Sequence, residues 1–554
     1  MIQFAPRGTA DFTPLGSLGG RLSALLRLRG VRTEEEARAF LRPGLDSLHD
    51  PLLLSGMEAA VRRIREAASA RERIMVYGDY DADGVCATAI LLEALTDAGV
   101  KAVSFMLPSR QEDGYGLNEA AVRKMAEKDV RLLITVDCGI SNRAEVALAR
   151  SLGISVIVTD HHQLPETLPE ADAIVHPLLG AYPCPHLCGA GVALKICQAL
   201  LGPEGMAKRL DLAAIATVAD VVPLTGENRA IVREGLRHIE TTGRPGLQTL
   251  LRLAGVTAPL RADALAFRIA PRLNAAGRLG DASLAVHLLL TGVPAKAEAA
   301  AAKLEEMNRA RQALEQGILS AALRQTAPAA GQAETRLLLA AGKGWNPGLI
   351  GLAAGKLCEK YFRPSVVLSL PEGGGPAVGS CRSIPGVNIY EMLRACGDLL
   401  LRFGGHEGAA GLTVARENLP ALRERLERVI RDSCEESCFV RRLEYDLEVP
   451  FGDWTPDTLA ELELLEPTGC GCPPPVFLLS GACVDSFRAV GSGGAHLQLS
   501  LRVADGISLR GIGFGLGGEA ETLPQEIDLL YRPVLNEYGG RRSVEAQFSA
   551  LRRA

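Results

Sequence analysis

The sequence predicts an α/β protein of several domains, in which a parallel sheet comes first and a small β-barrel comes last. From about residue 72 onward, short apolar runs alternate with amphipathic segments of helical period, which is typical of βαβ units and a parallel sheet. After about residue 440 the helical patterns largely stop and short alternating strands follow, which favours a β-barrel. A chain of 554 residues has room for three or four domains of about 150 residues each.

The elements of the first half follow from this pattern in order. Residues 1–70 carry leucine and arginine at helical spacing and predict a helical N-terminal region. Residues 71–225 predict the α/β domain with the parallel sheet. Its predicted strands are Ile74–Tyr77, Val103–Leu107, Leu132–Val136 and Ser155–Thr159, and its predicted helices are Ala87–Ala98, Asn118–Lys128 and Asn142–Leu152.

The second half divides into three parts. Residues 226–330 are helical in pattern and end in a long Ala/Glu/Arg stretch from Pro294 to about Gln325, which predicts a helix that connects two domains. Residues 331–440 predict a second α/β domain, and residues 441–554 predict the barrel. The second domain has predicted strands at Arg336–Leu339 and Ser365–Leu370 and predicted helices at Leu349–Lys360, Asn388–Ala395 and Asn418–Arg431. The barrel has predicted strands at Phe477–Leu479, Leu497–Val503, Leu509–Phe514, Leu529–Val534 and Val544–Phe548.

Composition and charge narrow the class of protein. Hydrophobic residues make up 47% of the chain and charged residues 23%, which excludes wholesale disorder. The net charge of −5 excludes a protein that binds nucleic acid with its whole surface, so any site for a polyanion must be local. No run approaches the roughly 20 apolar residues that span a bilayer, and the N-terminus lacks a signal-peptide pattern, so we expect a cytoplasmic protein without membrane contact.

Acidic residues and histidines gather where predicted strands end. The carboxyl ends of parallel strands line one crevice of an open sheet, so side chains that follow different strands meet there. A further acid, Asp220 in the stretch 216–223, ends another apolar run and is expected to join them. The residues in question are Asp79, Asp81, Asp83, Asp137, Asp160, His161, His162 and Asp220.

Such a cluster of carboxylates predicts divalent metal ions. Packed carboxylates repel one another and shift toward protonation unless cations neutralise them. Aspartate oxygens with one or two imidazoles suit Mn²⁺ or Mg²⁺, whereas the scarcity of thiolates argues against zinc. Two such ions can activate a water on one side and steady a leaving oxygen on the other, so the predicted chemistry is hydrolysis of a phosphate ester or anhydride.

Other interpretations of the first acidic motif are weaker. The pattern Asp79-x-Asp81-x-Asp83-Gly also opens an EF-hand loop, but that loop requires Glu at its twelfth position, which is Ile90 here, and a helix before it. A surface acidic turn would explain Asp79 to Asp83 alone. It would not explain the acids at the other strand ends.

The motifs together resemble the RecJ family of single-strand-specific DNA exonucleases, within the DHH phosphoesterase superfamily. The four motifs that resemble the metal-binding motifs of that superfamily are Val76–Gly84, Thr135–Gly139, Asp160–His162 and Val218–Asp220. Five stretches narrow the resemblance to RecJ: Arg110–Leu117, Cys188–Ala193, Ile269–Arg278, Gly379–Gly386 and Phe403–Gly411. The resemblance runs from about residue 70 to the C-terminus and implies a DHH catalytic domain, a long helix, a smaller DHH-associated domain and an OB-fold barrel.

The resemblance also implies roles for single residues. One metal ion would be held by Asp79, Asp81 and Asp137, and the other by Asp83, Asp137, His161 and Asp220, with Asp137 shared. Asp160 would orient the histidines, and His162 would face the scissile phosphate. The residues implied to contact substrate are Arg110, Arg272, Asn274, Arg278, Ser380, Arg382, Gly404, Gly405 and His406.

The activity implied is 5′→3′ hydrolysis of single-stranded DNA with release of nucleoside 5′-monophosphates, using two Mn²⁺ or Mg²⁺ ions, in recombination and repair. The resemblance further implies a monomer that works beside a single-strand-binding protein and a RecQ-like helicase. Two alternatives remain open at this point. One is a DHH phosphodiesterase for short oligonucleotides or cyclic dinucleotides, and the other is a non-catalytic scaffold that binds single strands.

Three positions depart from the family pattern. The chain has Asn346 where the family usually has histidine before Pro-Gly, His176 where it has asparagine, and Cys472 in place of the asparagine in the turn before the barrel. None of the three is a predicted metal ligand.

Overall fold

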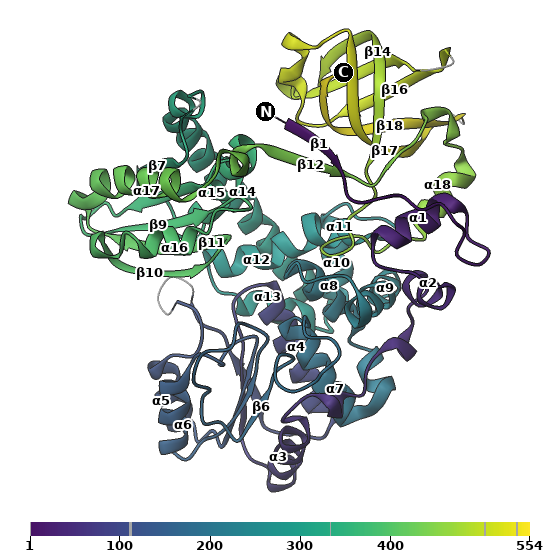
Figure 1. The fold of residues 1–554 in the computed structure, drawn as a ribbon. Coiled ribbons are helices and arrows are strands. Elements are labelled where there is room, and N and C mark those ends of the chain that lie inside the picture. The colour runs from purple at the N-terminus through teal and green to yellow at the C-terminus, as the bar shows by residue number, and fades with distance from the viewer. Residues whose placement is uncertain (1, 110–113, 333, 504–505, 539–540) are drawn as a thin grey trace.

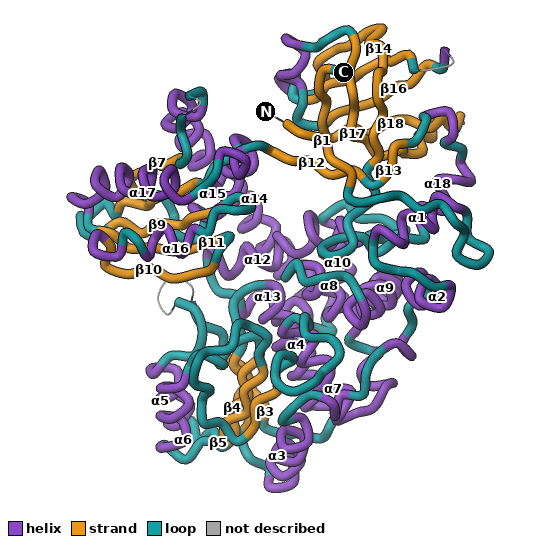
Figure 2. The backbone as a smooth tube through the Cα atoms, viewed as in Figure 1, coloured by secondary structure: helices purple, strands orange, loops and turns teal. Residues whose placement is uncertain are grey.

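The structure is a computed structural model that describes every residue except 1, 110–113, 333, 504–505 and 539–540. Figures 1 and 2 show an α/β body with helices on both sides of its sheet, a second α/β body, and a β-barrel that holds the C-terminus. Among the described residues, none of the helices combines the length and the apolar character that crossing a bilayer requires.

The first body is built on five parallel strands in the order β3-β2-β4-β5-β6. Continuous runs of Ile, Val and Leu form these strands because helices cover both faces of the sheet. Four of the five strands were predicted, and the three-residue β6 was not. Their bounds are β2 Ile74–Tyr77, β3 Val103–Met106, β4 Leu132–Val136, β5 Ser155–Thr159 and β6 Ala173–Val175.

Successive residues of β2 face opposite sides of this sheet, as the two-residue period of a strand requires. Ile74 and Val76 belong to the apolar core under α3, α4 and α7, whereas Met75 and Tyr77 belong to the core under α5 and α6. The helices are α3 Met57–Ala70, α4 Ala82–Asp97, α5 Glu119–Glu127, α6 Arg143–Ser151 and α7 Gly189–Ala207.

A helical region follows and leads into the second body. The connecting helix α14 runs over Pro294–Ala330, five residues beyond the predicted end near Gln325. It links the two bodies, because its first half packs on α10, α12 and α13 and its second half on α15 and β7 (Figure 1). The other helices are α8 Leu210–Ala219, α9 Gly226–Glu240, α10 Pro245–Leu253, α11 Ala262–Ala264, α12 Ala270–Leu279 and α13 Ser283–Leu290, with a π-helical turn at Leu265–Ile269.

The second body has a five-stranded mixed sheet in the order β10-β11-β9-β8-β7. Strands β7 Leu338–Lys343 and β8 Ser365–Leu370 are parallel, and the other three pair antiparallel. Those three, which were not predicted, are β9 Ala377–Arg382, β10 Leu400–His406 and β11 Ala409–Val414. Its helices are α15 Ile350–Tyr361, α16 Ile389–Arg394 and α17 Leu419–Ser433.

The C-terminal sheet closes into a barrel because β14 pairs with β15 on one side and with β17 on the other. All five predicted strands are present, most of them longer than predicted, and Phe477 and Tyr531 lie in the core with no exposed surface. The strands are β13 Leu447–Glu448, β14 Phe477–Val490, β15 His496–Arg502, β16 Ser508–Gly513, β17 Glu526–Tyr538 and β18 Arg541–Arg553; helix α18, Pro456–Glu463, precedes β14.

The N-terminal segment differs from its prediction as a helical region alone. A strand, β1 Ile2–Pro6, pairs in parallel with β12 Arg441–Tyr445, beside the barrel (Figure 1). Helices α1 Gly20–Leu28 and α2 Glu34–Leu41 do form, and their leucines join the apolar core of the barrel. The two ends of the chain are thus packed together, a contact that no local pattern encodes.

Candidate metal centre

The first acidic loop follows β2 and begins α4. Asp81 is the N-cap of that helix, and its Oδ1 accepts hydrogen bonds from the backbone N–H groups of Asp83 at 2.9 Å and Gly84 at 3.0 Å. Gly84 packs so closely on the loop that a Cβ there would lie 2.5 Å from the carbonyl oxygen of Asp79. The loop is therefore a tight turn that holds its acids at the carboxyl edge of the sheet.

Asp83 points away from its own helix toward α7. Its two carboxylate oxygens accept the backbone N–H groups of Gly189 and Ala190, each at 2.7 Å, in the first turn of α7. The positive end of that helix stabilises the carboxylate. A Cβ at Gly189 would lie 2.5 Å from the Cβ of Asp137, so the glycine allows α7 to approach both acids.

Asp137 follows β4 and lies at the centre of the cluster. Its φ of 61° is in the left-handed region, which is uncommon for a residue other than glycine and marks sites held by their surroundings. Its Oδ1 lies 3.0 Å from His161 Nε2. The same nitrogen lies 3.7 Å from carboxylate oxygens of Asp83 and Asp220, so His161 faces three acids.

Asp220 reaches the site from a helix rather than from a strand. The sequence placed it after an apolar run treated like the other strand ends, but residues 210–219 form helix α8, and Asp220 is its C-cap. The error arose because α8 is buried on all sides, so that it shows no polar face and no helical period. The side chain nevertheless joins the predicted cluster.

The ligand atoms of these residues form three groups within which all atoms lie within 4.8 Å of one another. The groups are Asp79, Asp81 and Asp137; Asp83, His161 and Asp220; and Asp137, His161 and His162. Two buried atoms at the centre, Asp137 Oδ1 and His161 Nε2, lie 3.0 Å apart, but neither makes a well-aligned hydrogen bond to any described residue. Such atoms, surrounded by further oxygen donors, fit divalent cations such as Mn²⁺ or Mg²⁺.

The electrostatics of the cluster agree with this fit. Burial, followed by the charges of Asp83 and Asp81, raises the pKa of Asp137 well above its usual range and that of Asp220 to about 8. Burial lowers the pKa of His161, which keeps its imidazole neutral and able to act as a ligand. The protein alone therefore does not neutralise the site, and cations are the missing charge.

The carboxylate of Asp160 holds His162 in place. Asp160 Oδ1 accepts the backbone N–H of His161 at 2.7 Å and the ring Nδ1 of His162 at 2.7 Å. Burial works against the charged ring, but the hydrogen bond to Asp160 together with the charges of Asp160, Asp220 and Asp83 outweighs it and raises the pKa of His162 to about 9. The raised pKa favours the protonated form of His162 at neutral pH.

Tyr115 was not among the predicted site residues, although it lies in the Arg110–Leu117 motif. Its hydroxyl lies 3.0 Å from His162 Nδ1 and 3.2 Å from the carbonyl oxygen of Asp137, to which it donates. The loop that carries it is fastened by Asn142, whose side-chain amide bonds both the N–H and the carbonyl of Leu117. A tyrosine between two glycines in this motif was the only sequence signal for this contact.

Two of the three departures from the family pattern have structural roles at the centre and beside it. His176 Nε2 donates to the backbone carbonyl of His162 at 2.8 Å, and its Nδ1 accepts the N–H of Leu178. Asn346 accepts the backbone N–H of Gly348 at 2.7 Å in the turn before α15. Both side chains thus order backbone next to predicted site residues.

Four of the predicted substrate residues of the second body lie in two rows across its sheet. Gly404 on β10 lies across β11 from Ser380 on β9. Two residues further along, His406 on β10 lies across β11 from Arg382 on β9. The first turn of α15 adjoins them, because a Cβ at Gly351 would lie 2.9 Å from Ser380 Oγ and 3.2 Å from Arg382 Nη2. Gly405 lies between the two rows on β10, with its φ of 141° in the region that favours glycine.

The remaining predicted substrate residues are spread along α12. Arg278 donates to the carbonyl oxygen of Gly348 at 2.9 Å and so bridges to the second body. Arg272 pairs with Glu305 of α14, with 2.6 Å between Nε and Oε2. Asn274 accepts the N–H of Ala82 at 2.8 Å, which places it against the acidic loop. Arg110 lies outside the described residues.

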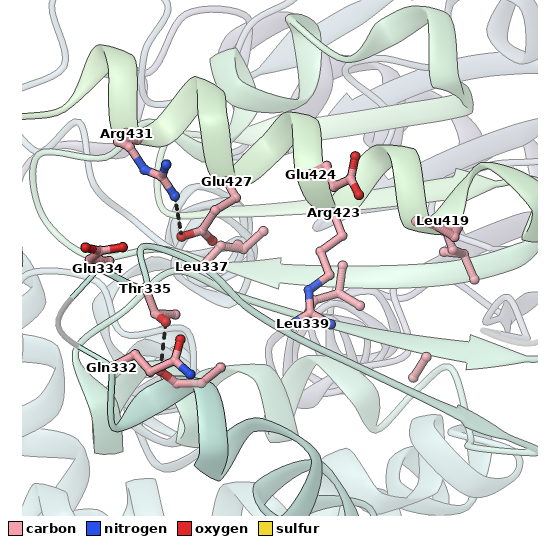
Figure 3. Close-up of a pocket in the computed structure, with 13 residues that line it drawn as sticks. Gln332, Glu334, Thr335, Leu337, Leu339, Leu419, Arg423, Glu424, Glu427 and Arg431 are labelled. Carbon is pink, nitrogen blue, oxygen red and sulfur yellow. Dashed lines mark hydrogen bonds and ion pairs between the residues drawn. The ribbon is translucent and has the colours of Figure 1, made fainter.

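A pocket of about 670 Å³ lies at the opposite edge of the second sheet, between α14, β7 and α17 (Figure 3). Arg423 extends across it, and Arg431 pairs with Glu427 on its rim. Its walls mix arginine and glutamate and contain none of the residues predicted for the site, so it is separate from the metal centre.

Comparisons with known proteins agree with this geometry. The family model described as the DHH family, N-terminal domain, matches residues 73–219, the DHHA1 domain matches residues 334–432, and the RecJ OB domain matches residues 445–550. The chain is 35% identical to the single-stranded-DNA-specific exonuclease RecJ of Dickeya dadantii over 98% of both chains. It is 39% identical to the protein of the same name from Bacillus subtilis over 94% of this chain and 66% of that protein. The crystal structure of RecJ from Thermus thermophilus with Mn²⁺ superposes with a TM-score of 0.84 at 34% identity, over 100% of this chain and 80% of that one.

Proposed function

Because the chain belongs to the RecJ family of single-stranded-DNA-specific exonucleases, we propose that it degrades single-stranded DNA from the 5′ end and releases nucleoside 5′-monophosphates. It is a metal-dependent hydrolase with a DHH domain, a DHHA1 domain and an OB domain. The observation that carries the proposal is the meeting of five aspartates and two histidines in three overlapping ligand groups.

The residues of the cluster have distinct tasks in this proposal. Asp79, Asp81 and Asp137 hold one Mn²⁺ or Mg²⁺ ion, and Asp83, Asp137, His161 and Asp220 hold the other. Bound ions supply Lewis-acid activation of water and charge stabilisation of the phosphate. His162, which is charged and hydrogen-bonded to Asp160, donates a hydrogen bond from Nε2 to the scissile phosphate. Tyr115 keeps the imidazole of His162 in place.

The second body binds the terminal nucleotide. Ser380 and Arg382 on β9 contact its phosphate from one side of β11, and the backbone at Gly404 and Gly405 with the ring of His406 on β10 contact it from the other side. Arg278 joins them from α12. A contact to a terminal 5′-phosphate would set the polarity, since only one end of the strand then reaches the metals in register. Arg272 lines the path of the strand, and the same role for Arg110, which lies outside the described residues, stays a prediction from the sequence.

The barrel holds the rest of the strand through backbone charge and base stacking, as OB folds do. Phe514 in this domain is 56% exposed and offers a surface on which a base can stack. We further propose that the protein acts as a monomer in the cytoplasm, in recombination and repair, beside a single-strand-binding protein and a RecQ-like helicase. Neither a cyclic dinucleotide nor a short oligonucleotide requires a separate strand-binding barrel.

The deciding experiment follows a 5′-labelled and a 3′-labelled oligonucleotide over time with Mn²⁺, Mg²⁺ or EDTA, beside a blunt duplex. We expect immediate release of labelled mononucleotide from the 5′ end and stepwise shortening of the 3′-labelled strand, only with metal and only on single strands. Stepwise shortening from the 3′ end would contradict the polarity. Binding without cleavage under any metal would support a scaffold, and cleavage restricted to dinucleotides would support a small-substrate phosphodiesterase.

A further inference from the structure

The segment that joins α18 to the barrel, residues 465–472, begins in the apolar core of the barrel at Leu465 and ends in the apolar core of the first body at Cys472. We call these residues the tether. Cys472 has no exposed surface and belongs to the same apolar core as α4, α7 and α8, which surround the metal centre. The backbone N–H of Leu224 donates to the carbonyl oxygen of Cys470 at 2.8 Å. The C-terminal end of the tether is therefore packed in the apolar core of the first body.

A buried arginine fastens the tether. Arg229 on α9 is 1% exposed, and its guanidinium donates to the carbonyl oxygens of Pro467 at 2.7 Å, Leu465 at 2.8 Å and Glu466 at 3.1 Å. It also donates to the carbonyl oxygen of Phe40 at 2.7 Å and lies over the Phe40 ring, 4.1 Å from its centroid. The guanidinium of Arg229 thus binds three carbonyl groups of the tether and one of the N-terminal region, and connects both segments to α9.

The same tether presses on the residues that follow Asp220. A Cβ at Gly471 would lie 2.9 Å from the Cβ of Pro223, and a Cβ at Gly469 would lie 2.8 Å from the Leu224 side chain. Neither position therefore has room for a side chain. Asn228, next to Arg229, donates to the carbonyl oxygen of Pro223 at 3.1 Å. Residues 223–225 are thereby held between α9 and the tether, and they begin three residues after Asp220.

We propose that the tether is a positioning element of the metal centre and that Arg229 is its positioning residue. Asp220 caps the end of α8, and Val221 after it has a φ of 58°, in the left-handed region. A backbone in that conformation persists only where its surroundings hold it, and the chain that follows it, from Pro223 onward, is held by the tether and α9. The position of the strand-binding barrel on the rest of the protein is in this way coupled to the position of the Asp220 carboxylate. This inference rests on the proposed role of Asp220 as a metal ligand.

The test compares Arg229→Met with Arg229→Lys and with Arg233→Met in the full-length protein. Arg233 lies one turn further along α9 and donates to the carbonyl oxygen of Leu41, so it contacts the N-terminal region without contacting the tether. Mn²⁺ binding is titrated directly by electron paramagnetic resonance of free Mn²⁺, at a temperature below the melting point of all variants. Asp220→Asn serves as the reference for loss of a ligand.

We expect Arg229→Met to weaken Mn²⁺ binding about tenfold, the lower end of the effect seen when a group that orients a metal ligand is lost. Arg229→Lys should fall between this variant and the wild type, because it keeps the charge and loses the fork. Arg233→Met should bind Mn²⁺ like the wild type. Wild-type affinity in folded Arg229→Met, or equal weakening in Arg233→Met, would overturn the proposal.

A second variant decides the matter if Arg229→Met does not fold. Gly471→Ala removes no hydrogen bond, but it pushes on Pro223 and strains a tether residue whose φ is 69°. It should therefore weaken Mn²⁺ binding while the barrel stays folded, and unchanged affinity would overturn the proposal. Because Mn²⁺ binding is measured without DNA, the two hypotheses fail separately. Tether-dependent Mn²⁺ binding without cleavage contradicts only the nuclease, and cleavage with tether-independent binding contradicts only the tether.

Discussion

Asn274 on α12 accepts a hydrogen bond from the backbone N–H of Ala82, the residue between Asp81 and Asp83, with 2.8 Å between the two atoms. Helix α12 lies directly on the acidic loop, since a Cβ at Gly277 would be 2.3 Å from the carbonyl oxygen of Tyr80. Asn274 was predicted to contact substrate. Its hydrogen bond to Ala82 makes it a support of the metal-binding loop.

We expect Asn274→Ala to destabilise the fold by about 1 kcal/mol, because the N–H of Ala82 loses its partner. Mn²⁺ should be required at higher concentration for the same rate of cleavage. Urea unfolding and a Mn²⁺ titration of the rate measure the two effects. Asn536→Ala is the matched control, since that amide bonds Glu545 in the barrel; an equal effect on the Mn²⁺ requirement there would contradict the role given to Asn274.

Asp137→Asn should abolish cleavage and spare most of the binding of single strands. Asp137 belongs to two of the three ligand groups, so its loss affects both predicted ions. A gel assay for cleavage and fluorescence anisotropy for binding separate the two effects. Asp129→Asn, at an exposed position after α5, should behave as the wild type. Cleavage by Asp137→Asn at the wild-type rate would sink the assignment of a shared ligand.

Tyr115→Phe should lower kcat about fivefold with little change in KM. The hydroxyl touches His162 and the carbonyl of Asp137, and removing one such hydrogen bond costs about 1 kcal/mol. Steady-state kinetics on a short single strand give both constants. A rise in KM with kcat unchanged would instead assign Tyr115 to ground-state binding of the strand.

The stabilisation of the protein by Mg²⁺ should grow with pH. Without metal, the pKa of Asp220 is raised to about 8, chiefly by burial and by Asp83. A carboxyl whose folded pKa is raised contributes stability below its unfolded pKa, and this contribution is lost as pH rises through the folded value. The chelated protein therefore weakens between about pH 4 and pH 8, whereas bound Mg²⁺ neutralises the acids.

Melting temperatures with saturating Mg²⁺ and with EDTA, compared at about pH 6 and about pH 8.5, measure this effect. The difference between the Mg²⁺ and EDTA samples should be larger at the higher pH. In Asp137→Asn, which removes one of the interacting charges, the difference should depend less on pH. A difference that shrinks with pH in the wild type would contradict the origin given for the stabilisation.

Local patterns predicted the first body well because its strands are encoded locally. Strands β2, β4 and β5 have the predicted bounds, since each is a continuous apolar run that ends at a polar turn. Helix α14 was predicted from its length and composition. The strands β9, β10 and β11 were missed because glycine and arginine interrupt them, and their pairing partners lie elsewhere in the chain.

The sequence by itself determined the parallel sheet, the connecting helix, the barrel and the identity of the acids and histidines at the centre. Only the tertiary structure decided that Asp220 arrives from a helix, that β1 pairs with β12, and that Tyr115, Asn274 and the tether support the site. The reason is physical. Strand and helix propensities and the residues after a strand act over a few positions, whereas these contacts join positions far apart in the chain and arise only when separate elements pack together.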